Sequence, residues 1–202
     1  MYNFIVFTGL DGSGKGEQIA KLSQYLYEKN KHKDIYLTRE PSNSPYGKKI
    51  REEILKETNP LKKARLCLEL YTKDRGWHVN NIILPQLQKG NILICDRYYY
   101  DTMAFQQTQG ISLNEIIELN KRFPKPDITF ILDVNAETAL KRIEKRGLSK
   151  TKFEELEFMK ELKENFLDLP NHLNDNIKII NAVKSIEEVF ADIHKYFEEE
   201  ND

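Results

Sequence analysis

The chain has 202 residues, and its 31 Lys or Arg against 32 Asp or Glu give a net charge of −1. This near balance argues against a protein dedicated to duplex DNA, which usually carries a basic excess. The length supports one hydrophobic core, so we expect a single domain over residues 1–202. No stretch approaches the roughly 18 apolar residues of a membrane span, and no basic leader opens the chain, which favours a cytoplasmic protein.

The two cysteines, Cys67 and Cys95, are too few for a disulfide framework or a thiolate metal site. Their neighbours are apolar, which predicts that both are small buried residues. The four histidines are scattered through polar or helical segments, so we assign none of them a catalytic role.

The first half of the chain alternates short apolar runs with amphipathic segments. In chain order, we predict a strand at 4–7, a helix at 15–29, a strand at 34–38 and helices at 48–56 and 61–87. Pro85 is expected to kink or divide the last of these helices.

The second half continues the alternation. It predicts a strand at 91–95, a strand at 127–134, a helix at 136–145, a strand at 176–180 and a helix at 185–197. Alternating strands and helices indicate an α/β protein whose parallel sheet has helices on both faces. Ligands of such sheets bind beyond the carboxyl ends of the strands, so the residues that follow each strand are the ones to inspect.

A glycine-rich loop follows the first predicted strand and fits the pattern G-x-x-x-x-G-K. The strand before it and the amphipathic helix after it are the context in which this pattern holds phosphates. Glycines let backbone N–H groups curl around phosphate oxygens, and the lysine adds a positive charge. The predicted ATP-binding residues of this loop are Gly9, Leu10, Asp11, Gly12, Ser13, Gly14, Lys15 and Gly16.

Gly16 departs from the usual pattern, which has Ser or Thr at this place. That hydroxyl normally binds Mg²⁺ between the β- and γ-phosphates. Without it, the metal must be held by water, substrate phosphates and another carboxylate, or activity is reduced. We expect replacement of Gly16 by Ser or Thr to keep or raise the rate.

Charged residues follow two other strands. Thr-Arg-Glu-Pro occupies 38–41, Asp-Arg-Tyr occupies 96–98, and the helix between these blocks carries Tyr71 and Arg75 on one face. Arginine suits phosphate because its planar fork binds two oxygens and stays charged. The strand ends therefore predict a site for phosphorylated ligands.

Together with the glycine-rich loop, these blocks resemble the thymidylate kinases of the P-loop nucleoside monophosphate kinase group, in order and over nearly the whole chain. The resemblance implies a P-loop NTPase-type α/β fold with a five-stranded parallel sheet in the order 2-3-1-4-5 and a short lid at about 142–154. It also implies Mg²⁺-dependent transfer of the γ-phosphoryl group of ATP to dTMP, giving dTDP for dTTP synthesis. A homodimer that uses the helices around 61–87 and 102–109 is implied as well.

The same resemblance assigns roles to individual residues. A pyrimidine stacks on Tyr71 while Arg75 binds its exocyclic oxygen, and Phe105 closes against the 2′ carbon of the sugar. Asp96 is the residue expected to hold Mg²⁺ through water. Where the family often has a Ser-Asn or Ser-Thr pair, this chain has Asp101-Thr102, a departure that bears on base specificity. The predicted acceptor-binding residues are Asp11, Arg39, Glu40, Tyr71, Arg75, Arg97, Phe105 and Gln106.

The stretch 142–154 is polar, contains one glycine and lacks apolar periodicity, which favours a lid. The family places a catalytic arginine either in the phosphate loop or in the lid, and this loop has none. The lid cations are Arg142, Arg146, Lys150 and Lys152. Arg146 is the first choice for catalysis beside Lys15 and Arg97, and Arg142 is assigned to ATP.

Two other functions stay open. One is a kinase of the same fold with another acceptor, such as dUMP, a different nucleoside monophosphate or a nucleoside. The other is a nucleotide-binding protein with reduced catalysis, which only Gly16 supports. In each case the expected partners are small nucleotides, ATP and most simply a deoxynucleoside monophosphate, with neither a nucleic-acid polymer nor a membrane.

Overall fold

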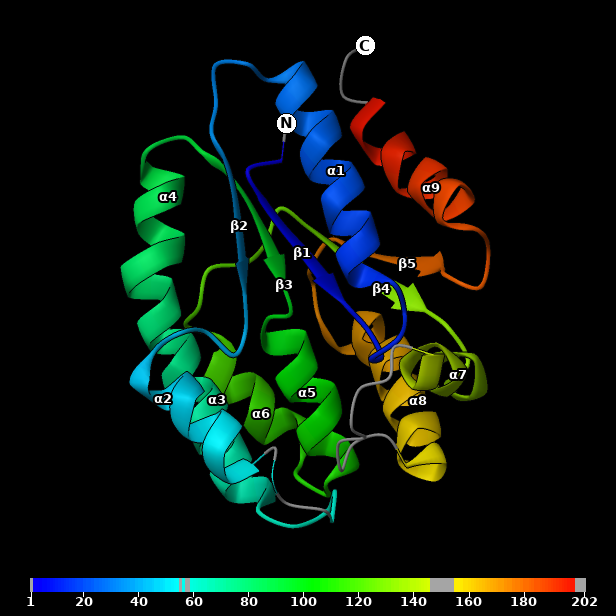
Figure 1. Cartoon of the computed structure of the whole chain (residues 1–202). Coiled ribbons are helices and arrows are strands. Elements are labelled where there is room, and N and C mark those ends of the chain that lie inside the picture. Colours follow the sequence, from blue (N-terminus) through cyan, green and yellow to red (C-terminus); the bar gives the residue numbers. More distant parts are fainter. Residues whose placement is uncertain (1, 55, 57–58, 146–154, 199–202) are drawn as a thin grey trace.

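The predicted strands form one parallel sheet in the order β2-β3-β1-β4-β5 in the computed structural model (Figure 1). The structure describes residues 2–54, 56, 59–145 and 155–198. Its strands are β1 (Phe4–Thr8), β2 (Ile35–Arg39), β3 (Ile92–Asp96), β4 (Ile128–Asp133) and β5 (Ile177–Asn181). Each predicted strand end lies within one residue of the observed end, and the predicted fold is confirmed.

β1 lies at the centre of the sheet, where Phe7 pairs with Asp96 of β3 on one side and with Phe130 of β4 on the other. All five side chains of β1 are buried, because helices cover both faces. This explains its uninterrupted apolar sequence. The edge strands are more open, and Leu37 of β2 is 50% exposed.

Two helices, α1 (Lys15–Lys29) and α9 (Ile186–Glu198), pack together on one face of the sheet (Figure 1). The predicted bounds of α1 are confirmed, and its apolar stripe of Ile19, Leu22 and Leu26 is buried. The opposite face is covered by α4 (Leu84–Gln88) and α8 (Leu156–His172). Cys67 and Cys95 are both buried in the core between these layers, as predicted.

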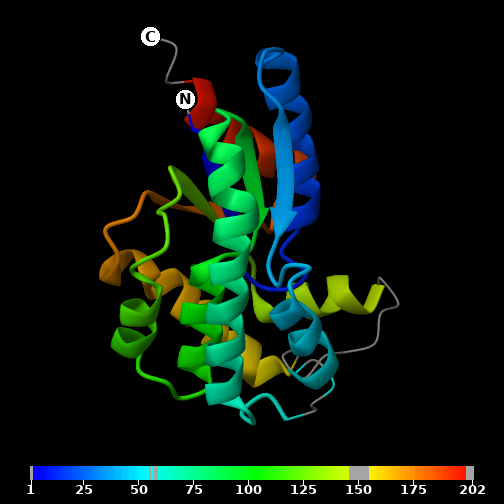
Figure 2. The ribbon, with the colours of Figure 1, turned by 90° about the vertical axis from the view of Figure 1, so that its left-hand side faces the viewer.

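The predicted helix at 61–87 consists of three consecutive helical segments that continue one another (Figure 2). α3 (Ala64–His78) passes into the π-type segment η2 (Val79–Ile83), and α4 then begins at Leu84. Proline cannot donate to the carbonyl of the preceding turn and its ring crowds that carbonyl, so the turn before Pro85 is widened. The expected division at Pro85 is thus confirmed.

The predicted helix at 48–56 is wrong in its bounds. α2 spans Pro45–Lys49 and is followed by a π-type segment, η1 (Ile50–Ile54). The helix starts early because the Ser44 hydroxyl accepts a hydrogen bond from the Gly47 N–H at 2.9 Å, with a proline at the first helical position.

Three further helices complete the described chain. α7 (Ala136–Lys145) agrees with the prediction, and α5 (Tyr99–Thr108) follows β3. α6 (Leu113–Asn120) and α8 were not predicted. A Ser-x-x-Glu pattern at residues 112–115 signalled the start of α6. No helix in the described ranges is long and apolar enough to cross a membrane.

Backbone hydrogen bonds bring the residues after β1, β2 and β3 together. The Glu40 N–H donates to the Asp96 carbonyl at 3.0 Å, and the Arg97 N–H donates to the Phe7 carbonyl at 2.8 Å. Arg97 adopts a left-handed backbone conformation with φ of 74°, which turns the chain from β3 toward α5. The carboxyl end of the sheet therefore collects the glycine-rich loop and both charged blocks.

Candidate active site

The glycine-rich loop needs its glycines for close backbone approach. A Cβ at Gly12, where φ is +82°, would lie 2.4 Å from the Ala139 carbonyl oxygen. Lys15 is buried, and its ammonium donates to the carbonyls of Gly9 and Leu10, both at 3.0 Å. Burial and nearby Arg97 lower the pKa of Lys15 against the opposing effect of three carboxylates. The loop thus holds a cation in place under the phosphate-binding backbone.

A cavity of about 210 Å³ lies beside this loop and contains the predicted acceptor-binding residues. They come from the loop itself, the end of β2, α3 and the β3–α5 region. The structure brings all of them to one site, whose lining is Asp11, Arg39, Glu40, Pro41, Tyr71, Arg75, Arg97, Tyr98, Asp101, Thr102, Phe105 and Gln106.

Arg97 is held between two carboxylates at the entrance to this acceptor cavity. Its guanidinium donates to Asp11 at 2.6 Å and to Asp101. Burial alone would lower the pKa of Arg97, but Asp11, Asp101 and Asp96 raise it above its ordinary value. The Arg97 side chain is therefore charged and fixed in direction before any ligand arrives.

Asp101 is the acid that replaces the serine expected from the family resemblance. One of its oxygens accepts from the Thr8 hydroxyl at 2.7 Å and from the Tyr98 N–H at 3.2 Å. Burial raises the pKa of Asp101, although Arg97 and Lys15 oppose the change. This carboxylate links β1, the start of α5 and Arg97.

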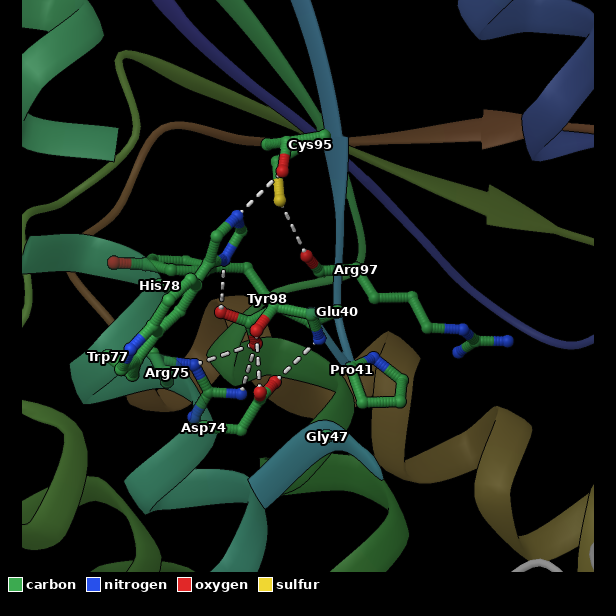
Figure 3. A network of polar contacts seen from close by, with 12 residues as sticks. Glu40, Pro41, Gly47, Asp74, Arg75, Trp77, His78, Cys95, Arg97 and Tyr98 are labelled. Carbon is green, nitrogen blue, oxygen red and sulfur yellow. Dashed lines mark hydrogen bonds and ion pairs between the residues drawn. The ribbon is translucent and has the colours of Figure 1, made fainter. Parts of the chain in front are cut away.

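Arg75 also lines the acceptor cavity, and it is more deeply buried than Arg97; Figure 3 shows its polar contacts. It is 1% exposed, and it donates through Nε and Nη2 to one carboxylate oxygen of Glu40, at 3.0 and 2.7 Å. It also donates to Thr102 at 2.9 Å and to Asn120 at 2.5 Å. These bonds use four of its five N–H groups and leave one, on Nη1, without a partner in the described chain.

His78 completes the Glu40 network. Its Nδ1 lies 3.2 Å from the other Glu40 oxygen, and its Nε2 lies 2.6 Å from the Thr38 hydroxyl. Figure 3 shows the Glu40 carboxylate between Arg75 and His78, whereas the Arg97 side chain extends away from this network. His78 was not predicted, because a lone histidine on a helix carries no spacing signal.

Glu40 was predicted to bind substrate, but both of its oxygens are already bonded within the protein. Its backbone segment is held by Asp74, a buried neighbour of Arg75 in sequence. Asp74 accepts from the Ser42 N–H and hydroxyl and from the Ser44 hydroxyl, at 2.5 to 2.8 Å. Glu40 therefore lines the cavity as the counter-ion that orients Arg75.

Two aromatic residues narrow the acceptor cavity. Tyr71 lies on α3 one turn before Arg75, and burial raises the pKa of its hydroxyl, so the ring is neutral. Phe105 of α5 lies with its ring 5.7 Å from the Arg97 guanidinium and packs against Phe158 and Phe166 of α8. These rings form apolar walls for a flat ligand.

A larger cavity of about 490 Å³ lies on the other side of the glycine-rich loop. Asp11 lines the acceptor cavity, and the next residue, Gly12, lines this one. Arg142 donates to the carbonyls of Gly12 at 3.4 Å and Ala182 at 3.1 Å. The other residues that line this larger cavity are Ser13, Gly14, Glu17, Gln18, Lys145, Lys184, Ile186 and Val189.

The buried hydroxyl of Ser13 has no hydrogen-bond partner in the described chain, so it is available to a phosphate. Lys184, between β5 and α9, and Ile186, the first residue of α9, were not predicted as part of this site. The predicted catalytic Arg146 and the alternatives Lys150 and Lys152 lie outside the described residues.

Asp96, the predicted metal residue, lies at the end of β3. Its Oδ1 is buried and has no hydrogen-bond partner in the described chain, which leaves an oxygen for a water or cation. At Gly16 an added Cβ would meet no atom within 4 Å, so the missing hydroxyl is not excluded by crowding. The described residues contain no cluster of three or more His, Cys, Asp or Glu that could hold a metal.

Two cavities that meet at a phosphate-binding loop, at the carboxyl end of a 2-3-1-4-5 parallel sheet, define a P-loop phosphotransferase with separate donor and acceptor sites. A family model described as thymidylate kinase matches residues 7–193. The chain belongs to the thymidylate kinase family.

Individual relatives agree with this assignment. A probable thymidylate kinase of Pyrococcus horikoshii is 37% identical over 195 residues, or 94% of this chain and 93% of that protein. A thymidylate kinase of Desulfotalea psychrophila is 37% identical over 192 residues, with 94% and 91% covered. The crystal structure of thymidylate kinase from Ehrlichia chaffeensis has a TM-score of 0.76 at 28% identity, over 96% of this chain and 97% of that one.

Membership confirms the prediction of a phosphotransferase enzyme that uses ATP as donor and a nucleoside monophosphate as acceptor. It agrees with ATP-dependent phosphorylation of dTMP and disfavours both alternatives.

Proposed function

We propose that this chain transfers the γ-phosphoryl group of ATP to dTMP, with Mg²⁺, through the residues assembled at its two cavities. The main support for this proposal is the acceptor cavity, which is lined by all eight predicted acceptor-binding residues, from four separate parts of the chain. Arg39 and Arg97, the latter held by two carboxylates, suit a phosphate, and apolar walls with few polar groups suit a pyrimidine.

The acceptor phosphate binds at Arg39 and Arg97. Asp11 and Asp101 hold the Arg97 side chain in one orientation, so its guanidinium can bind the phosphate without a change of rotamer. Asp11 lines the same cavity as these two arginines, and its carboxylate can accept a hydrogen bond from the sugar. A 2′-deoxy sugar suits the space beside the Phe105 ring, which a ribose hydroxyl would crowd.

The base stacks on Tyr71, and its edge is read by Arg75 and Gln106. The remaining N–H of Arg75 suits the exocyclic O4 of thymine, which is an acceptor. Gln106 is 1% exposed, and its Oε1 has no partner in the described chain, so it suits the N3–H donor of thymine. Cytosine presents an amino donor and an N3 acceptor, and both would oppose these groups.

ATP binds in the donor cavity, where the loop backbone, the Ser13 hydroxyl and Lys15 receive its phosphates. Arg142 borders the same cavity and contacts the nucleotide beyond the phosphates. Arg146 is proposed as the lid cation that covers the developing charge. It lies in the proposed lid, 142–154, of which only 142–145 belong to the described chain.

Mg²⁺ fits this site because it can bind through water to the Asp96 oxygen that has no partner in the described chain. This carboxylate would hold the ion where Gly16 offers no hydroxyl. A bound ion would neutralise charge on the ATP phosphates. The protein's own contribution is positioning and electrostatic stabilisation by Lys15 and Arg97. A general base is unnecessary, because the acceptor phosphate is already an anionic nucleophile.

A coupled ADP-release assay across dTMP, dUMP, dCMP, the purine monophosphates and thymidine tests this function. We expect the highest kcat/KM with dTMP, and a preference for any other acceptor would overturn the proposal. Calorimetry with ATP–Mg²⁺ and dTMP separates turnover from binding, because a protein that binds both without releasing ADP is not this enzyme.

We further propose a single-domain, cytoplasmic homodimer that binds neither membranes nor nucleic-acid polymers. The buried apolar residues of the described chain form one cluster, which supports one domain. In the 61–87 region, Arg65, Glu69 and Lys73 form an exposed stripe on α3. The other expected segment, 102–109, is mostly buried among α3, α6 and α8 and offers little to a partner. Sedimentation velocity tests the dimer.

A further inference from the structure

Gln106 is joined to a second buried glutamine at the end of α5. The Gln106 Nε2 donates to the Gln109 Oε1 at 3.0 Å, and the Gln109 Nε2 in turn donates to the backbone carbonyl of Pro60. The two glutamines are 1% and 9% exposed, so water does not compete freely for their amide groups. These two hydrogen bonds therefore connect the Pro60 backbone carbonyl, through Gln109, to Gln106 in the wall of the acceptor cavity.

The donors and acceptors in this series of hydrogen bonds determine the orientation of both side-chain amides. A carbonyl oxygen only accepts hydrogen bonds, so Gln109 must turn its NH₂ group toward Pro60. This turns the Gln109 oxygen toward Gln106, which must then present its own NH₂ group. The Gln106 Oε1 is consequently the atom left over, and it has no partner in the described chain.

We propose that Gln109 is a specificity-determining positioning residue, because it locks the Gln106 amide with its acceptor available to the base. The inference rests on the proposed function, in which Gln106 reads the base edge. A locked acceptor selects bases with an N–H at position 3, thymine and uracil, and rejects cytosine, whose N3 is itself an acceptor. Without the lock, the Gln106 amide rotates by 180° and offers NH₂ to cytosine at little cost.

The test measures kcat/KM for dTMP, dUMP and dCMP in Gln109→Met, which keeps side-chain length and removes both hydrogen bonds. We expect the dTMP-to-dCMP ratio to fall by about tenfold, the worth of one fixed hydrogen bond. The dTMP-to-dUMP ratio should stay unchanged, because both bases carry the N3–H. An unchanged dTMP-to-dCMP ratio would overturn the proposal, as would an equal loss for all three acceptors.

A matched control separates positioning from general damage. Gln107→Met makes the same change two residues earlier on α5, at a residue that does not line the acceptor cavity, and should keep the dTMP-to-dCMP ratio. Loss of the ratio in this variant would contradict the proposed role of Gln109.

Failure of this inference is distinguishable from failure of the proposed function. If the unmodified enzyme does not prefer dTMP, the proposed function fails. If it prefers dTMP and Gln109→Met keeps that preference over dCMP, only the role of Gln109 fails.

Discussion

The acceptor and donor cavities meet at one loop, yet they are built from different groups. In the acceptor cavity, the side chains of Glu40, Arg75 and Gln106 are almost fully buried and held in fixed directions, the first two by each other and Gln106 by Gln109. The donor cavity is bordered by loop backbone and by cations on its rim, of which Lys145 and Lys184 are exposed.

This difference matches what each ligand requires. A nucleobase is distinguished by donors and acceptors on its edge, so the groups that read it must be dry and fixed. A triphosphate is recognised mainly by charge, for which backbone N–H groups and mobile cations are sufficient. Mutations on the acceptor side should therefore be costly, and mutations on the donor side mild.

The largest effect is expected from Glu40→Gln, which leaves the Arg75 guanidinium buried without its counter-ion. Breaking such a pair costs about 3–5 kcal/mol, and the melting temperature should fall by roughly 10 °C in a chain of this size. Differential scanning calorimetry measures the change. The control, Glu69→Gln, breaks an exposed pair with Lys73 and should leave the melting temperature almost unchanged. Equal shifts in both variants would remove the contrast between buried and exposed pairs.

The next effect is expected from Arg97→Lys, which keeps the charge but loses the fork between Asp11 and Asp101. We expect kcat/KM for dTMP to fall by about 10²–10³-fold. Arg142→Lys makes the same change at the donor cavity and should raise KM for ATP by only about tenfold. Steady-state kinetics with each substrate varied in turn checks both numbers, and a larger loss at Arg142 would reverse the comparison.

A smaller effect should appear in the pH dependence of stability. Because burial raises the folded-state pKa of Asp101, the native state binds this proton more tightly than the unfolded chain. The resulting stability is complete below about pH 4, the ordinary aspartate pKa, and is lost as the pH rises through the folded-state value. Asp101→Asn should therefore gain stability relative to the parent as the pH rises above about 4, as measured by urea unfolding. A difference independent of pH would show that Asp101 is not desolvated.

The smallest effect is expected at Gly16 on the donor side. Gly16→Ser should keep or raise kcat, because an added Cβ meets no atom within 4 Å, and lower the Mg²⁺ concentration at half-activation, because it adds a hydroxyl ligand. The matched control, Gly12→Ser, forces a Cβ against the Ala139 carbonyl at a positive φ and should lose activity and stability. A collapse of turnover in Gly16→Ser with the fold intact would contradict this tolerance.

Much of the fold followed from local pattern. The strands and α1 were predictable because apolar periodicity and glycine punctuation are local properties, and α7 agreed for the same reason. The early start of α2 was missed because it depends on a side-chain cap, the hydrogen bond that Ser44 accepts from the Gly47 N–H. α8 was missed although Phe158, Leu162, Phe166 and Leu169 recur at helical spacing.

The acceptor site was predictable in its members but not in their roles. The predicted residue Glu40 lines the acceptor cavity, and only the structure shows that its carboxylate is also the counter-ion of Arg75. His78, Asn120 and Gln109 carry no motif, and their positions depend on how α3, α5 and α6 pack. Contacts between residues tens of positions apart leave no trace in spacing.

The sequence by itself determined the alternating α/β pattern, the phosphate loop and the cations that follow the strands, because each depends on residues near one another in the chain. Tertiary structure alone decided how deeply each of those charges is buried and with which carboxylate it is paired. Arg75 and Arg97 look equivalent in sequence, but packing bonds one to Glu40 in the interior and holds the other between two carboxylates at the cavity entrance. The reason is that desolvation and hydrogen-bond direction, which set a charge's role, exist only once distant segments have come together.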